Sequence, residues 1–409
     1  MTSPAVASPA ADTAAATCAA VNLLAFAGFF SGAALRICDG LLPRLGSDFG
    51  VTAGVAGRVV LTFAIAYGIS QLLFGPLGDR YGKARVMCAS LFASALGALA
   101  CAMAPDFSAL VRLRIFWGIS AAGVIPLAIA WIGDAVPYEQ RQATLARLLM
   151  GTLSGMTAGQ LGGGLFADSA AGWRGAFGTL CAGYVVVGLL LLLRLRSIPS
   201  APPVRGGGRF AFAAQIGSVL AVPWARVVVI CVFTEGIFLM GPLAFLPSYL
   251  HQHFGLALAT ASGLIAMYAF GGLLYALVAQ HVVRRLGERR MVQAGGTVMG
   301  LAFLALYATP VAWAAAPIAL VLGFGTYLLH NTLQTNATQM APATRGSAMA
   351  LFAFCFFNGR AIGVSLAGAA YDHGGPLPLL VAPALVLPVL GWSFAAALRR
   401  RAQAGPRGG

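Results

Sequence analysis

Long apolar runs, separated by short polar or charged segments, occupy almost the whole chain. Of its 409 residues, 59% are hydrophobic and only 9% are charged, against about 25% charged residues in soluble domains. A helix needs about 20 mostly apolar residues to cross the hydrocarbon core of a bilayer. The chain is therefore predicted to be an all-α membrane protein, and this composition excludes an ordinary soluble enzyme.

The boundaries of the apolar runs predict twelve transmembrane helices. They cover residues 19–42, 55–77, 85–104, 109–132, 144–167, 173–193, 227–250, 257–281, 291–309, 311–337, 346–371 and 377–398. The boundary between the ninth and tenth helices is the weakest, because only Thr309 and Pro310 mark a turn there.

The longest connection contains Pro202, Pro203 and the glycine run 206–208, which indicate a linker between two halves. No Lys or Arg precedes Arg36, so a cleaved signal peptide is not expected and the first span is retained. The predicted organisation is a disordered cytoplasmic tail (1–18), a six-helix half (19–194), a cytoplasmic linker (195–226), a second six-helix half (227–398) and a basic cytoplasmic tail (399–409).

Four sequence anchors recur in the same order half a chain later. Leu42-Pro43 matches Leu246-Pro247, Phe49-Gly50 matches Phe254-Gly255, Gly82 matches Gly287, and Pro137 matches Pro342, at an offset of 204 or 205 residues. A constant offset over four anchors predicts that the two six-helix halves are related by a parallel repeat.

Basic residues predict how the bundle is oriented in its membrane. The chain has 26 Lys and Arg against 11 acidic residues. With both termini in the cytoplasm, only Arg44, Arg58, Arg112 and Arg174 fall at the outer surface. The positive-inside rule therefore predicts a multi-pass protein of the plasma (inner) membrane with cytoplasmic termini. No continuous basic face indicates nucleic acid as a partner.

The most specific local motif is Gly-Pro-Leu-Gly-Asp-Arg-Tyr-Gly-Lys-Ala-Arg at 75–85, between the second and third spans. Its glycines permit close helix approach and a tight turn, and its acid can pair or cap at a helix end. The residues concerned are Gly75, Gly78, Asp79, Arg80, Gly82 and Lys83. This segment resembles the loop signature of the major facilitator superfamily, with Lys83 at a position that is usually arginine.

Further stretches extend the resemblance over most of the chain. Arg114 to Gly118 looks like the superfamily's motif in the fourth helix, and Asp134 to Arg141 looks like the loop that follows it. Arg36 to Pro43, Trp173-Arg174 and His330 to Gln334 resemble the drug/proton antiporter branch.

The resemblance implies a secondary active transporter rather than an enzyme, namely a proton-coupled exporter of small amphiphilic molecules that works by alternating access. The alternatives are a proton-coupled importer or facilitator of a small metabolite, and a non-transporting membrane sensor. The expected partners are a small-molecule substrate, protons and the lipid bilayer, with no cofactor or metal and no second copy of the chain.

Charged residues inside spans are the strongest candidates for proton coupling, because each costs about 2.5 to 3.5 kcal/mol at a helix centre. Asp39 and Arg114 share a depth near the outer surface, and Glu235 and Arg360 lie near mid-membrane. We expect an Asp39–Arg114 pair and a Glu235–Arg360 pair. The alternative for the outer residues is that they snorkel separately to the interface, which is favoured for Arg36.

Polar side chains elsewhere in the spans are expected to line a substrate cavity, or else to bond neighbouring helices. They are Tyr67, Gln71, Gln160, Tyr268, Tyr275, Tyr327, Asn331, Gln334 and Asn358. In the fifth span, glycines spaced four apart predict a close helix-packing seam; they are Gly151, Gly155, Gly159 and Gly163. Gln160 stands where the antiporter motif has a proline.

Overall fold

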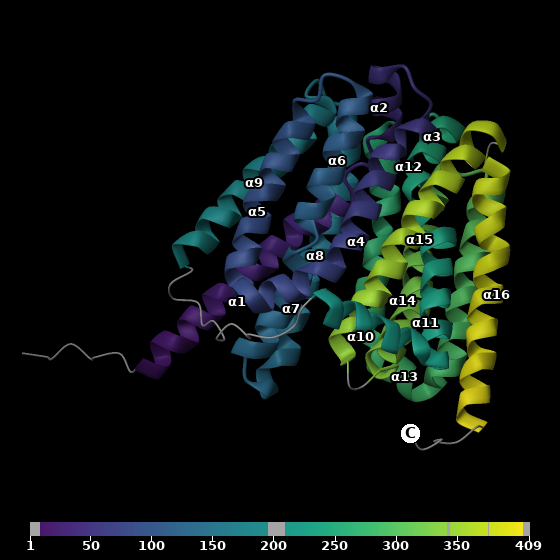
Figure 1. Ribbon diagram of the computed structural model, residues 1–409. Coiled ribbons are helices and arrows are strands. Elements are labelled where there is room, and N and C mark those ends of the chain that lie inside the picture. The colour runs from purple at the N-terminus through teal and green to yellow at the C-terminus, as the bar shows by residue number, and fades with distance from the viewer. Residues whose placement is uncertain (1–8, 195–208, 342–343, 375, 404–409) are drawn as a thin grey trace, which may run out of the picture.

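The computed structural model describes residues 9–194, 209–341, 344–374 and 376–403, which form helices and their connecting turns. The helices stand side by side in one bundle (Figure 1). They are α1 (Pro9–Arg36), α2 (Leu42–Phe49), α3 (Ala53–Ala56), α4 (Arg58–Tyr81), α5 (Lys83–Ala102), α6 (Phe107–Ala121), α7 (Val124–Ala135), α8 (Tyr138–Ala167), α9 (Gly172–Arg194), α10 (Arg209–Ala221), α11 (Pro223–Glu235), the π-helical η1 (Gly236–Met240), α12 (Gly241–Phe254), α13 (Leu258–Ala308), the 3₁₀ turn η2 (Ala312–Ala314), α14 (Ala315–Gln339), α15 (Arg345–Gly374) and α16 (Pro376–Gln403).

The described helices account for all twelve predicted spans. Nine are long and apolar enough to cross a membrane, some of them built from consecutive helices such as α6 and α7. The 51-residue α13 contains two spans, because Gly287 takes a φ of 67° and breaks the helix between them. The apolar part of α1, Ala20–Arg36, and the 30-residue α8 supply the remaining two. The predicted twelve-helix fold is therefore confirmed.

The ends of the spans differ from the prediction. The tail expected to be disordered over residues 1–18 is helical from Pro9 onward, because proline suits the first turn and the alanines after it are the best helix formers. The expected linker contains α10, whose Gln215 accepts a hydrogen bond of 2.8 Å from Ser347 of α15. The last helix continues to Gln403. Residues 1–8, 195–208 and 404–409 lie outside the described residues.

Left-handed glycines confirm the predicted repeat in the backbone. Gly50 and Gly255 have φ values of 64° and 66°, and Gly82 and Gly287 have 90° and 67°. The members of each pair are 205 residues apart, the same offset as in the sequence. A left-handed backbone costs other residues roughly 1–2 kcal/mol, so glycine is required at each of these turns. The fourth anchor, Pro342, lies outside the described residues.

Two seams of glycine bring backbones into direct contact, one in each half. In the first half, glycines of α8 face carbonyl groups spaced four residues apart along α1 and the turn that follows it; the pairs are Gly151 with Ala25, Gly155 with Phe29, Gly159 with Ala33 and Gly163 with Ile37. In the second half, Gly359 of α15 faces the Phe233 carbonyl of α11 and Gly363 faces the Ile237 carbonyl of η1. A Cβ at any of these glycines would overlap the facing carbonyl oxygen.

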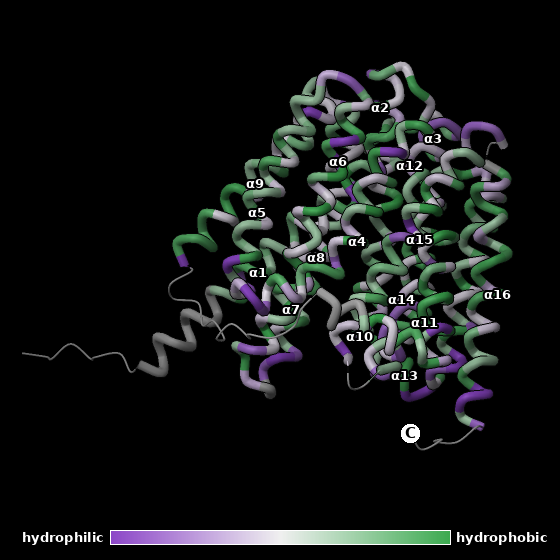
Figure 2. Tube along the Cα trace, viewed as in Figure 1, coloured by the Kyte–Doolittle hydropathy of each residue, from purple (hydrophilic) through white to green (hydrophobic). Residues whose placement is uncertain are grey.

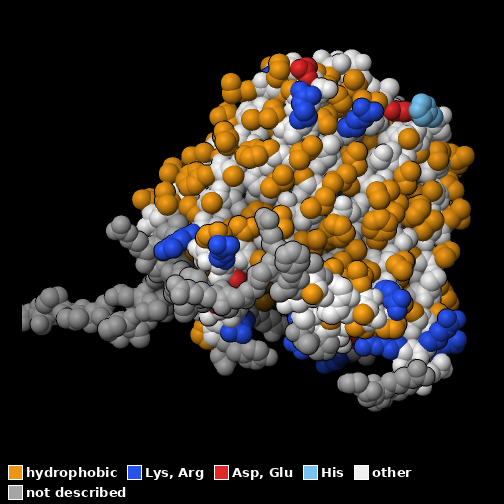
Figure 3. Space-filling model, viewed as in Figure 1, with side chains coloured by type: hydrophobic (Ala, Val, Ile, Leu, Met, Phe, Trp, Pro, Cys, Tyr) orange, Lys and Arg blue, Asp and Glu red, His pale blue; other side chains and the backbone are white. Residues whose placement is uncertain are grey.

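The bundle has two chemically different ends. We call the end where α1 begins and α16 ends the terminal side, and the end that carries α2 and α3 the distal side (Figure 1). Apolar residues fill the middle of the helices, and hydrophilic residues gather towards both ends (Figure 2). On the face shown in Figure 3, most Lys and Arg side chains lie towards the terminal side of a hydrophobic band. The assignment of the terminal side to the cytoplasm stays a prediction.

Candidate functional site

A buried ionic cluster joins the two halves. Asp39 lies in the turn that ends α1, is fully buried, and contacts a guanidinium group on each side. Its Oδ2 lies 2.9 Å from Nη1 of Arg36 in the same half. Its Oδ1 lies 3.4 Å from Nη2 of Arg360, which comes from α15 in the other half. Arg360 Nη2 also donates a 2.9 Å hydrogen bond to the Leu35 carbonyl.

The cluster holds two cationic groups for one carboxylate, and Arg36 and Arg360 are each only 3% exposed. Charges this deep are unfavourable unless they are paired. If Asp39 bound a proton, both ion pairs would be lost and two guanidinium groups would face one another across the halves. The protonation state of Asp39 therefore alters the contact between the halves directly.

The predicted pairing of Asp39 with Arg114 is wrong in this structure. The Nε of Arg114 donates a 3.0 Å hydrogen bond to the Val59 carbonyl of α4. Its guanidinium carbon lies 4.0 Å from the ring centre of Phe63 and 4.7 Å from that of Trp117. The sequence predicts the same depth for Arg114 and Asp39, but in the structure Arg114 packs against the aromatic rings inside the first half.

The predicted pairing of Glu235 with Arg360 is also wrong. Glu235 is fully buried at the end of α11, and its Oε2 lies 2.9 Å from Nδ1 of His330 on α14. Its Oε1 has no hydrogen-bond partner among the described residues. Arg360 lies on the part of α15 that faces α1, so it reaches Asp39 instead. The π-helical segment η1 follows Glu235 at once, and such bulges are frequent at functional sites.

A narrow cavity lies between α1, α8, α13 and α14, where the halves meet. Its lining residues are Arg36, Leu153, Met156, Thr157, Gln160, Ile265, Ala266, Tyr268, Ala269 and Tyr327. Of the predicted cavity residues, Gln160, Tyr268 and Tyr327 are therefore brought together. Gln160 is only 2% exposed, and among the described residues neither its amide oxygen nor its amide nitrogen has a partner.

The other predicted cavity residues lie elsewhere. Asn331 donates a 2.9 Å hydrogen bond to the Tyr275 hydroxyl, so these two polar groups satisfy one another. Tyr67 packs on Phe357 of the other half with ring centres 4.6 Å apart. The remaining three are Gln71, which is half-buried on α4, Gln334, which is exposed on α14, and Asn358, which packs against Gly68.

The residues of the loop motif contact one another and the neighbouring loop of the same half. Lys83 Nζ lies 3.2 Å from Asp79 and 2.5 Å from Asp134 of α7. Gly82 makes the turn with a φ of 90°, and Gly78 lies against Leu127 of α7. Arg80 lies over the ring of Tyr81, and Gly75 has no side chain or neighbouring backbone within 4 Å of its Cβ position.

The expectation that Arg36 snorkels to the interface is wrong, because Arg36 is buried and pairs with Asp39. Sequence reasoning gives no site role to His330, and it does not name Asp168 and Asp372, which bridge the halves on the distal side. Two signals could have found them. Arg36 stands three residues before Asp39, a spacing that places both on one helix face. Asp168 and Asp372 are separated by 204 residues, the offset of the repeat.

Residues 24–405 match the family model of the Major Facilitator Superfamily, and the chain belongs to that family. It is 24% identical over 345 residues to the MFS-type transporter YceJ of Bacillus subtilis, covering 84% of this chain and 87% of the relative. It is 30% identical over 155 residues to a chloramphenicol resistance protein of Streptomyces lividans, covering 38% and 39%.

The fold is also that of solved transporters. The crystal structure of a mutant of the nucleoside transporter NupG superposes with a TM-score of 0.75 at 15% identity, covering 92% of this chain and 98% of that one. At this identity the likeness concerns the fold alone. Together with the family match, it makes this chain a multi-pass membrane transporter.

Proposed function

We propose that the chain is a proton-coupled transporter that exports small amphiphilic molecules, with Asp39 as the group that takes up the proton. The observation that carries the proposal is the position of Asp39 between Arg36 and Arg360, which belong to different halves. Protonation removes both attractions, so the two protonation states favour different arrangements of the halves. A difference of this kind is what alternating access driven by protons requires.

The cavity chemistry supports an amphiphilic substrate. Among the described residues Gln160 has no hydrogen-bond partner, so its amide offers a donor and an acceptor to an amide or hydroxyl group on the ligand. Tyr268 and Tyr327 supply ring faces, while Leu153 and Met156 supply apolar surface. Such a lining, mostly apolar with few polar groups, is typical of small-molecule sites. The cavity has a volume of about 20 Å³ in this conformation, so the proposal requires it to widen when the halves separate. The name of the chloramphenicol resistance relative favours export as the direction.

A proton-coupled importer of an anionic metabolite is the second candidate. The surplus guanidinium charge favours it, because an anion bound at Arg36 would compete with Asp39 for that group. Asp39 would then bind a proton more readily, so anion and proton would travel in the same direction.

For either candidate, we propose that the terminal side faces the cytoplasm and that the monomer is the working unit.

Flux measurements in proteoliposomes separate the candidates. Chloramphenicol serves as the neutral probe and benzoate as the anionic probe, each tested with and without an imposed pH gradient. An exporter moves chloramphenicol against the direction of proton flow. Movement of benzoate with the protons, beyond the passive movement of benzoic acid in protein-free liposomes, instead supports the importer. Binding of a probe with no effect of the pH gradient on its flux contradicts proton coupling.

A further inference from the structure

An acid at the end of α8 caps a helix of the opposite half. The Oδ2 of Asp168 accepts a 2.7 Å hydrogen bond from the Ala259 backbone N–H, and its Oδ1 accepts one of 3.3 Å from Leu258. These are the first two residues of α13, and the residue before them, Ala257, has no side-chain group to cap the helix. Asp168 thus supplies from the first half the acceptor that a helix N-terminus favours.

Asp372 near the end of α15 makes the reciprocal contact. Its Oδ1 accepts a 3.0 Å hydrogen bond from the Gly54 N–H, and its Oδ2 accepts one of 2.5 Å from the Thr52 hydroxyl. Thr52 is the N-cap of α3, and Gly54 is the second residue of that helix. Here an acid of the second half caps a helix of the first.

The two contacts share one hydrogen bond, in which an acid of one half accepts from the N–H of the second residue of a helix in the other half. Asp372 follows Asp168 by 204 residues, and Ala259 follows Gly54 by 205. The N-cap residues Thr52 and Ala257 are also 205 apart. These offsets equal those of the repeated turns, so the parallel repeat places one acid from each half on the same position of a helix from the other.

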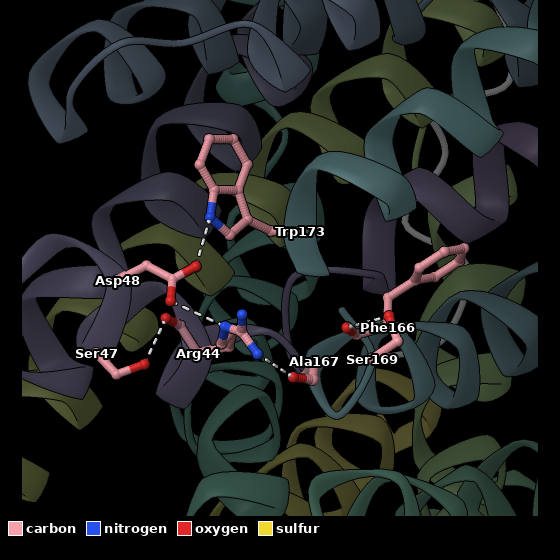
Figure 4. A network of polar contacts seen from close by, with 7 residues as sticks. All are labelled: Arg44, Ser47, Asp48, Phe166, Ala167, Ser169 and Trp173. Atoms are coloured by element: carbon pink, nitrogen blue, oxygen red, sulfur yellow. Dashed lines mark hydrogen bonds and ion pairs between the residues drawn. The ribbon is translucent and has the colours of Figure 1, made fainter. Parts of the chain in front are cut away.

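The residues on either side of Asp168 belong to a polar network within the first half (Figure 4). Arg44 of α2 donates a 3.0 Å hydrogen bond to the carbonyl of Ala167, the residue before Asp168. Ser169, the residue after it, donates one of 2.9 Å to the Phe166 carbonyl. Asp48 fixes Arg44 through an ion pair of 2.9 Å between its Oδ1 and Arg44 Nε, and its Oδ2 accepts a 3.1 Å hydrogen bond from the Trp173 indole N–H. The carboxylate is therefore presented to α13 from an anchored helix end.

We propose that Asp168 and Asp372 are a symmetric pair of positioning residues that hold the distal side closed, and that both contacts must break before the carrier opens to that side. The proposal rests on alternating access but on neither the substrate nor the coupling ion. Because Asp168 is exposed and Asp372 partly so, each contact contributes modestly. We expect loss of one carboxylate to raise the distally open population roughly threefold, and loss of both roughly tenfold.

A single cysteine reports on distal opening. Ser262 is fully buried on α13 and lies against Gly40 and Gly164 of the other half, so its position is accessible only when the halves separate. In a variant with the seven native cysteines replaced, Ser262→Cys is labelled with a membrane-impermeant maleimide in proteoliposomes. The labelling rates of Asp168→Ala, Asp372→Ala and the double variant are compared in this background.

Asp106→Ala is the matched control, because Asp106 caps α6 at 2.8 Å from the Ala109 N–H without leaving its own half. The proposal expects faster labelling in both single variants, the fastest in the double variant, and no change in Asp106→Ala. Unchanged labelling in the double variant overturns it, and so does an equal rise in the control. Should an alanine variant not fold, Asp168→Asn and Asp372→Asn keep the side-chain shape while removing the charge and one of the two acceptor oxygens, so faster labelling is expected from them as well. Labelling needs no substrate and no pH gradient. The labelling rates therefore test the distal contacts even if the protein does not export the proposed substrates.

Discussion

Replacing Asp39 by asparagine removes the only negative charge from the buried cluster of Arg36, Asp39 and Arg360. The carboxylate lies 2.9 Å from Arg36 and 3.4 Å from Arg360, on opposite oxygens. The two guanidinium groups are therefore within about 8 Å of one another, where unit charges at an effective dielectric constant of about 20 repel by about 2 kcal/mol. Breaking a buried ion pair costs about 3–5 kcal/mol, so we expect Asp39→Asn to lower the stability of the folded protein by several kcal/mol.

A second substitution should recover part of that loss. In the double variant Asp39→Asn/Arg360→Met, one of the two facing cations is gone, and the repulsion of about 2 kcal/mol goes with it. Arg360→Met alone leaves Arg36 and Asp39 as a neutral pair, so its effect should be the mildest of the three. The expected order of stability is Arg360→Met above the double variant, and the double variant above Asp39→Asn.

Thermal unfolding in detergent, followed by tryptophan fluorescence, measures this order. In a chain of this size about 2 kcal/mol corresponds to a shift of a few degrees. If the double variant unfolds at or below the temperature of Asp39→Asn, repulsion between Arg36 and Arg360 does not destabilise the Asp39→Asn variant. The control is Glu235→Gln combined with Arg360→Met, whose effects should add, because Glu235 pairs with His330 and not with Arg360.

Two further predictions concern helix packing and the loop motif. Gly155→Ala should destabilise the protein by about 1–3 kcal/mol, because the added Cβ would lie 2.6 Å from the Phe29 carbonyl carbon. The control is Gly162→Ala, whose added Cβ would have no atom of another part of the chain within 4 Å among the described residues. It should not lower the unfolding temperature. Asp79→Asn should leave expression and insertion normal yet slow transport, because the acid can no longer pair with Lys83 during conformational exchange; flux equal to wild type would contradict this.

The sequence predicts a depth for each charged residue, but it does not identify the residue's partner. Distance along a span follows from the number of apolar residues on either side, which places Asp39 with Arg114 and Glu235 with Arg360. Partner choice depends on which face each helix turns to its neighbours. The aromatic rings of Phe63 and Trp117 hold Arg114 inside its own half. The rotation of α6 that turns Arg114 towards these rings cannot be recognised from a single sequence.

The repeat is the most informative signal in the sequence, and it extends beyond its four anchors. Glycines and prolines mark the two halves, because backbone geometry demands those residue types at turns. The same offset relates Asp168 to Asp372, but single acids at helix ends are common, so nothing local distinguishes them. The apolar runs that predict transmembrane spans do not predict the beginning of α1 at Pro9, because residues 9–18 are too polar for a span. Their alanines nevertheless favour a helix.

Transport by Asp39→Asn reports whether Asp39 couples protons to transport, because asparagine mimics the protonated acid permanently. The measurement is flux in proteoliposomes with and without a pH gradient, on monodisperse protein below its unfolding temperature. We predict that the variant binds substrate and exchanges it across the membrane without energy input, yet accumulates none in response to the gradient. A variant that still concentrates substrate would remove Asp39 from the coupling role and transfer it to Glu235 with His330.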